Sequence, residues 1–114
     1  MPATFTIQRS ADAQIYFLLT ADNNEPLLTS ETYSSKSSAR TGIASVRVNG
    51  PIDARYRRKA SSDGKHYFVL TAANAEPIGT GEMYNSAQAM QKGIEAVKRV
   101  APNAPERDLT GDPG

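Results

Sequence analysis

The sequence from Tyr16 to Ala21 reads YFLLTA, and 51 residues later the sequence from Tyr67 to Ala72 reads YFVLTA. The match continues on both sides without a gap, and 17 of the 37 positions from Ser10 to Val46 are identical to the position 51 residues further along. Self-similarity at a fixed spacing is the signature of a duplicated structural unit. We therefore interpret the chain as two tandem copies of one unit.

Each copy has the pattern of three strands. Phe5 and Ile7 alternate with polar residues, as in a half-buried strand. Further strands are expected at about residues 14–21 and 25–30 and, in the second copy, at about 65–72 and 76–81. The turn residue Asn24 has Ala75 as its counterpart. Because alanine is a poor choice for a left-handed backbone, we expect the second of these turns to be wider.

A helix follows the strands in each copy. Ser35 and Ser86 are candidate N-cap residues. The apolar residues after each cap recur at helical spacing; they are Ala39, Ile43 and Val46 in the first copy and Met90, Ile94 and Val97 in the second. Gly42 and Gly93 lie inside these helices, where glycine is unfavourable. We interpret both glycines as points where the helix approaches the sheet closely.

Two such units bury more apolar surface together than either does alone. We predict an α+β fold in which two tandem β3-α repeats form one antiparallel sheet with both helices on one face and a pseudo-twofold axis between them. A single domain would span residues 1–114, with repeat one at about 1–52, repeat two at about 53–103 and a Pro/Gly-rich tail at about 104–114. A short strand is expected at 106–109, and the chain is expected to be a monomer with an internal pseudo-dimer.

The motifs in both copies resemble the YegP-like family of small, uncharacterised bacterial tandem-repeat proteins. The matching segments are Phe17 to Glu25, Thr29 to Lys36 and Gly42 to Val46, repeated at Phe68 to Glu76, Thr80 to Ser86 and Gly93 to Val97. The resemblance covers about residues 4–100. It implies a β3-α unit repeated twice, with the strand after each helix exchanged into a shared sheet, and it implies no activity. The chain departs from the family pattern at Asn24 and Ala75, where glycine is usual, and at Ala87, where a lysine is missing.

Composition excludes several classes of protein. The 114 residues contain no cysteine, which rules out disulfide scaffolds, thiolate metal sites and cysteine nucleophiles. One histidine and scattered carboxylates give no metal-ligand set, and we expect neither a metal nor a cofactor. The longest apolar run, Ile15 to Leu19, is too short to cross a bilayer. The chain begins directly with a strand-like pattern, so we expect a cytoplasmic protein with no membrane association.

The charge is nearly balanced, with a formal net charge of +1. Residues 52–103 carry eight basic and five acidic side chains, and the tail from Ala104 carries a net charge of −2. A protein that coats nucleic acid through phosphate contacts is normally more basic. The balance therefore argues weakly against such a role.

The sheet face turned away from the helices is the leading candidate site. If Phe17 and Phe68 point to the helices, the neighbouring tyrosines point away. The candidate binding residues on this face are Tyr16, Tyr67, Arg55, Arg57 and Lys59. Tyrosines among basic side chains can stack bases and hold phosphates. We predict a non-enzymatic binding or interaction module, with a protein or a single-stranded nucleic acid as partner; an ordinary amphipathic sheet face is the simpler interpretation.

Two other classes of function remain open. One is a small enzyme in which the repeat-related Glu31 and Glu82 meet in a shared cleft, or in which His66 acts with Asp63 and a serine. The other is a structural or stress-related accessory protein without a dedicated ligand. A deep pocket containing both glutamates or His66 would favour the enzyme, and basic and aromatic residues gathered on the sheet face would favour the binding module.

Overall fold

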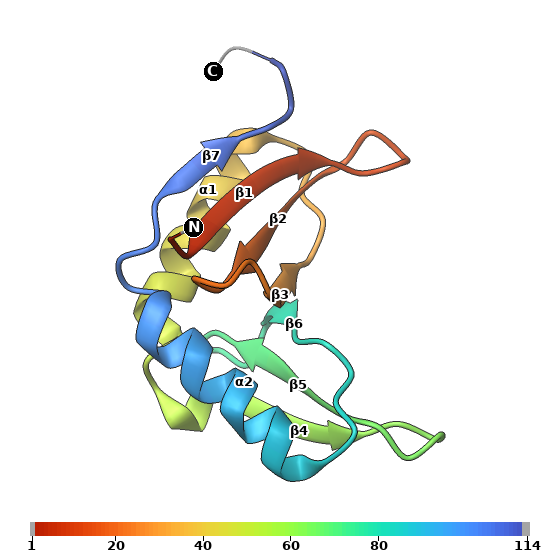
Figure 1. The fold of residues 1–114 in the computed structure, drawn as a ribbon. Coiled ribbons are helices and arrows are strands. Elements are labelled where there is room, and N and C mark those ends of the chain that lie inside the picture. Colours follow the sequence, from red (N-terminus) through yellow and green to blue (C-terminus); the bar gives the residue numbers. More distant parts are fainter. Residues whose placement is uncertain (1, 113–114) are drawn as a thin grey trace.

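Two copies of a three-strand, one-helix unit build the fold, as the repeat predicts (Figure 1). The computed structural model describes residues 2–112. The elements in chain order are β1 (Thr4–Arg9), β2 (Ile15–Thr20), β3 (Pro26–Ser30), α1 (Lys36–Asn49), the 3-10 helix η1 (Asp53–Arg55), β4 (Tyr56–Ala60), β5 (His66–Thr71), β6 (Pro77–Thr80), α2 (Ala87–Val100) and β7 (Glu106–Asp108).

One seven-stranded sheet joins the two repeats in the order β4-β5-β6-β3-β2-β1-β7. The repeats meet at its centre, where β3 and β6 pair antiparallel with Thr29 opposite Thr80. Strands β1 to β6 pair antiparallel with one another, as predicted. The short last strand β7 pairs parallel to β1, so the complete sheet is mixed rather than antiparallel (Figure 1). The chain reaches the β1 edge from the end of α2 and then runs alongside β1.

Both helices begin at the predicted caps. The N–H of Ser38 donates to Ser35 Oγ over 3.1 Å, and the N–H of Ala89 donates to Ser86 Oγ over 3.0 Å. A side-chain oxygen at this position satisfies a first-turn donor that has no partner within the helix. The two capping serines therefore fix the start of α1 and α2.

A single hydrophobic core lies between the helices and one face of the sheet. Phe5, Phe17 and Phe68 are fully buried from the sheet side, and Ile43 and Ile94 are fully buried from the helix side. The predicted helical stripes, which are Ala39, Ile43 and Val46 in α1 and Met90, Ile94 and Val97 in α2, are all buried. Helix α1 contacts β1 and β2 of its own repeat and also β5 and β6 of the other. Each repeat thus completes the core of its partner.

The turn at Ala75 is not wider than its counterpart, and that expectation is wrong. Asn24 has φ of 70° and Ala75 has φ of 69°. The N–H of each residue donates to the carbonyl of the alanine three residues earlier over 2.9 Å. Ala75 therefore adopts the same left-handed conformation as Asn24, in a turn closed by the same backbone hydrogen bond.

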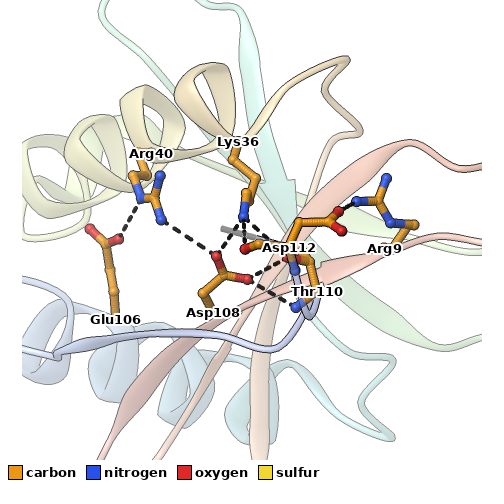
Figure 2. A network of polar contacts seen from close by, with 7 residues as sticks. All are labelled: Arg9, Lys36, Arg40, Glu106, Asp108, Thr110 and Asp112. Carbon is orange, nitrogen blue, oxygen red and sulfur yellow. Dashed lines mark hydrogen bonds and ion pairs between the residues drawn. The ribbon is translucent and has the colours of Figure 1, made fainter. Parts of the chain in front are cut away.

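Charged contacts fasten β7 and the residues after it to helix α1 (Figure 2). Lys36 Nζ donates to Asp108 Oδ2 over 2.8 Å and to the carbonyl of Asp112 over 2.5 Å. Arg40 Nε lies 3.3 Å from Glu106 Oε1. The counterpart of Lys36 in α2 is Ala87, and no strand in the described chain lies beyond β4. The second repeat thus lacks the lysine and, among the described residues, also lacks a strand added outside its edge strand β4.

The β4 end of the sheet is protected in a different way. The N–H of Tyr56, the first residue of the edge strand β4, donates to the carbonyl of Asp53 in η1, the turn that precedes the strand. Arg58, at the position of the buried Ile7, bonds Asp53 and Gln91. Charged residues and a local turn are common ways to prevent pairing at a sheet edge. Neither described helix is long and apolar enough to cross a membrane.

Candidate functional site

The sheet face turned away from both helices carries an aligned row of side chains across all seven strands. In the order of the sheet from β7 to β4, this row contains Arg107, Thr6, Leu18, Thr29, Thr80, Val69 and Arg57. Directly paired residues project from the same face of a sheet. We call this surface the open face. Its row begins and ends with an arginine and has two threonines at the pseudo-twofold axis.

A hollow of about 380 Å³ lies on the open face over β4, β5 and β6. Arg57 and Lys59 of β4 line it together with Val69, Thr71 and Thr80. Strand β4 has side-chain period 2, which places residues 57 and 59 on this face and Tyr56 and Arg58 on the helix face. The predicted grouping of Arg57 and Lys59 is thus present in the structure.

Neither Arg57 nor Lys59 forms an ion pair within residues 2–112. The guanidinium of Arg57 donates to the carbonyl of Ala54 over 3.0 Å. Helix-borne Lys36 and Lys98, in contrast, each contact a carboxylate. Arg57 and Lys59 outnumber Glu31, the acidic residue that lines the hollow, so the hollow has a net positive charge that can attract an anion.

The two predicted tyrosines lie on different halves of the open face. Tyr67 of β5 is directly opposite Lys59, which lines the basic hollow, but Tyr67 is not itself a lining residue. Tyr16 of β2 is opposite Gln8, and its hydroxyl lies 3.3 Å from Gln8 Oε1. Three strand spacings, about 14 Å, separate their strands. The structure therefore brings Tyr67 to the basic residues and leaves Tyr16 apart from them.

Arg55 does not lie on the open face with Arg57. It belongs to η1, and its Nε donates to Asn49 Oδ1 at the end of α1 over 3.0 Å. The alternation of β4 begins only at Tyr56, because the chain first makes a 3-10 turn after Pro51. The prediction that Arg55 lies on the open face extended the strand alternation back to residue 55 and is therefore wrong.

The glutamates of the enzyme alternative do not share a cavity among the described residues. Glu31 borders the hollow on the open face, whereas Glu82 lines a different cavity beside α2. General acid–base catalysis by two carboxylates needs both groups at one substrate. Glu31 and Glu82 line separate cavities, and this placement argues against one shared catalytic site.

His66 has a structural position at the start of β5. Its backbone exchanges two hydrogen bonds with Tyr84, of 2.8 and 2.7 Å, and its side chain is half-buried. Asp63 lies in the preceding turn, where Ser61 Oγ donates to it. Within residues 2–112 no three His, Cys, Asp or Glu side chains are arranged to hold a metal ion.

Five residues that line the hollow were not among the predicted site residues; they are Val69, Thr71, Ala75, Pro77 and Thr80. Val69 and Thr71 follow Tyr67 at the same period of two, so the alternation of β5 already placed them on the open face. Thr80 could not be found in this way, because its place in the hollow depends on the pairing of β6 with β5. That register is set by the fold and not by a local pattern.

These features define a small α+β tandem-repeat protein with an open, partly basic sheet face. The family model described as domain of unknown function DUF1508 matches the chain twice, at residues 10–56 and 61–108. Each match begins near the β1–β2 or β4–β5 turn and ends in the strand after the helix. The chain belongs to this family, and the resemblance found in its motifs is confirmed.

Similar proteins cover almost the whole chain. A UPF0339 protein of Bordetella pertussis is 49% identical over 106 residues, covering 93% of this chain and 96% of the relative. The UPF0339 protein YegP of Escherichia coli K12 is 46% identical over 110 residues, covering 96% and 100%. These relatives are uncharacterised, and the function of the family is unknown.

Solved structures of two relatives have the same fold. The solution NMR structure of YegP from Escherichia coli, described as a protein of unknown function, matches with a TM-score of 0.91 and 46% identity and covers 99% of this chain and 97% of its own. The solution NMR structure of a UPF0339 protein of Shewanella oneidensis matches with a TM-score of 0.89 and 42% identity, covering 96% and 93%.

Proposed function

We propose that the protein is a non-enzymatic binding module that holds an extended anionic ligand, single-stranded nucleic acid, on the β4–β5 half of the open face. The observation that carries this proposal is the pair Arg57 and Lys59, which line one hollow of about 380 Å³ and form no ion pair within residues 2–112. Tyr67 lies directly opposite Lys59. An aromatic ring beside two free cations offers base stacking and phosphate contacts together.

The charge distribution limits the size of the site. Two basic side chains in the hollow supply about two phosphate contacts, and the net charge of +1 adds little long-range attraction. Glu31 at the border of the hollow restricts the path of a strand on the side of β3. We therefore propose a short binding site of low affinity with a weak dependence on salt.

Fluorescence anisotropy with a labelled single-stranded oligonucleotide at several salt concentrations tests this function. Each phosphate contact contributes a slope of about −0.7 to the log–log plot of affinity against salt, so two contacts give about −1.4. The intact protein should bind at low salt with a slope near this value. Absence of binding at low salt would contradict the proposal.

A pull-down from a bacterial lysate, with and without nuclease, separates the two partner classes. Nucleic acid retained only without nuclease supports the proposed ligand. A protein that remains bound after nuclease treatment would indicate a protein partner instead. If the variant with alanine at residues 57 and 59 no longer retains that protein, the open face is its binding surface. The near-neutral charge of the chain is the feature that favours this second class.

A further inference from the structure

Two clefts lie on the helix side of the molecule, each between a helix of one repeat and a turn of the other. The first, of about 450 Å³, lies between α1 and the β5–β6 turn, and we call it the α1 cleft. The second, of about 390 Å³, lies between α2 and the β2–β3 turn, and we call it the α2 cleft. Both volumes fall in the range of small-molecule sites.

Six residues that line each cleft are identical between the two repeats. Ala21, Asn23, Glu25, Pro26, Tyr84 and Gly93 line the α2 cleft, and the residues at 72, 74, 76, 77, 33 and 42, which line the α1 cleft, are identical to them in turn. The first residues of the helices have diverged: Lys36 of α1 contacts Asp108 of β7, and its counterpart in α2 is Ala87. Identity between the repeats is thus retained in the clefts, although they are formed across the repeat boundary.

The fold explains some of these identities. Asn23 Oδ1 accepts from the N–H of Glu25 over 3.1 Å, and this bond closes the turn. Asn74 does the same for Glu76, also over 3.1 Å. Such side-chain turns account for asparagine at both positions. They do not explain why positions 25 and 76 are both glutamate, because only the backbone N–H of each takes part in the turn.

The carboxylates of Glu25 and Glu76 have no hydrogen-bond or ion-pair partner within residues 2–112. The same is true of Glu31 and Glu82, the other pair of glutamates that the repeats share. By contrast, Glu95 contacts Lys98 over 3.2 Å. The repeated glutamates therefore have no role in the ion pairs that stabilise the fold.

Each cleft also contains a half-buried tyrosine, Tyr33 or Tyr84, whose hydroxyl has no partner among the described residues. Burial raises the pKa of Tyr84, and the negative charges of Glu82 and Glu25 raise it further. Burial and the charge of Glu31 raise the pKa of Tyr33 in the same way. Both tyrosine hydroxyls therefore lie protonated in a negative field.

We propose that the α1 and α2 clefts are two equivalent binding sites for a primary ammonium group on an alkyl chain. The ammonium, with three donors and a positive charge, matches a free carboxylate and a tyrosine oxygen, both of which accept. The alkyl chain would lie on the apolar wall, which is Pro77 and Ile78 in the α1 cleft and Pro26 and Leu27 in the α2 cleft. The group can come from a free amine or from a lysine side chain.

The clefts differ in their charged lining. Glu82 gives the α2 cleft a second carboxylate, whereas its counterpart Glu31 lines the hollow on the open face and not the α1 cleft. Lys92 of α2 lines the α2 cleft, and its counterpart in the α1 cleft is Thr41. A lysine close to the site repels a second ammonium. The attraction of Glu82 and the repulsion of Lys92 oppose each other in the α2 cleft, so Lys92→Thr should tighten ammonium binding there and leave the α1 cleft unchanged.

Titration of the isotope-labelled full chain with 1,5-diaminopentane, followed by amide NMR shifts, tests the proposal. Amides of Thr41 and Ile78 report on the α1 cleft, and those of Leu27 and Lys92 on the α2 cleft. The controls of equal length are uncharged 1,5-pentanediol and anionic glutarate. A capped Gly-Lys-Gly peptide is titrated in parallel, and the stronger binder of the two shows whether the cleft prefers a lysine side chain or a free amine. Saturable shifts with either ammonium probe support the site.

Because the clefts are equivalent, each serves as the control for the other. Glu76→Gln should weaken binding in the α1 cleft about tenfold and leave the α2 cleft unchanged, and Glu25→Gln should do the reverse. Glu95→Gln, at an exposed glutamate outside both clefts, should change neither. The proposal is overturned if neither ammonium probe shifts the cleft amides, if the diol shifts them equally, or if the two glutamine variants affect both clefts alike.

Discussion

The hydroxyl end of Tyr33 lies directly over the backbone of Gly42, and a Cβ atom at residue 42 would overlap it. Tyr33 cannot easily move away, because its ring is stacked on Phe17 with centroids 6.2 Å apart. Tyr84 and Gly93 repeat the arrangement in the second unit. Glycine inside these helices therefore sets how closely α1 and α2 approach the sheet, as their sequence position predicts.

Gly42→Ala should lower the free energy of unfolding. Alanine gains about 1 kcal/mol of helix propensity, but overpacking against a fixed ring costs about 1–3 kcal/mol. We expect a net loss of about 1 kcal/mol in urea denaturation. In a Tyr33→Phe background, which removes the overlapping oxygen, the loss should be smaller. A more stable Gly42→Ala protein would show that the ring yields easily.

Local patterns predict the repeat, the strands, the caps and the buried stripes, because each depends on residues close in sequence. The parallel pairing of β7 with β1 depends on contacts such as that between Lys36 and Asp108, which are 72 residues apart. The α1 and α2 clefts join a helix of one repeat to a turn of the other, and no local pattern indicates this. The identity of Glu25 and Glu76 was the sequence signal for the clefts, because neither burial nor turn geometry explains a glutamate at these positions.

Ala75→Asn should raise the free energy of unfolding. Ala75 has φ of 69°, in the left-handed region that costs a residue with a Cβ about 1–2 kcal/mol. Asparagine tolerates this region better, and Asn24 already occupies the equivalent position. We expect a gain of about 0.5–1 kcal/mol in thermal or urea denaturation. The reciprocal change Asn24→Ala should cost a similar amount, and equal stability of all three proteins would contradict the argument.

Lys36→Ala should release β7 without unfolding the domain. The lysine contacts Asp108, Thr110 and Asp112 in the tail (Figure 2), whereas the core residues of α1 point to the sheet. Amide hydrogen exchange of Leu109, whose N–H donates to the carbonyl of Ile7 over 2.8 Å, should become faster. Lys98→Ala, which removes an ion pair far from the tail, is the control and should leave Leu109 protected.

The attachment of the tail should depend on pH in a defined direction. The Lys36 ammonium, together with hydrogen bonds from Thr110, holds the pKa of Asp108 well below its usual range. A pKa lowered in the attached state gives stabilisation that is complete above the ordinary value of about 4 and is lost as the pH falls through the lowered value. Leu109 should therefore stay protected at pH 5 and lose protection well below pH 4. Loss of protection between pH 7 and 5 would contradict this assignment.

The proposed nucleic-acid site predicts different effects for basic residues that are close together in the sequence. Arg57 and Lys59 line the hollow, whereas Arg55 donates to Asn49 in η1. The double change Arg57→Ala and Lys59→Ala should flatten the salt slope of oligonucleotide binding by about 1.4, because two phosphate contacts are lost. Arg55→Ala should leave the slope unchanged.

The repeat supplies the control for the aromatic contact. Tyr67→Ala should weaken oligonucleotide binding by about 1–3 kcal/mol, the value of one stacked base, and keep the salt slope, because no charge is removed. Tyr16 occupies the equivalent position on the β2 half, where its strand neighbour is Gln8 instead of Lys59. Tyr16→Ala should therefore leave the affinity for a short oligonucleotide unchanged, as anisotropy titrations of the two variants side by side would show. Equal weakening by both changes would mean that the ligand spans the whole open face and that the basic half alone does not form the site.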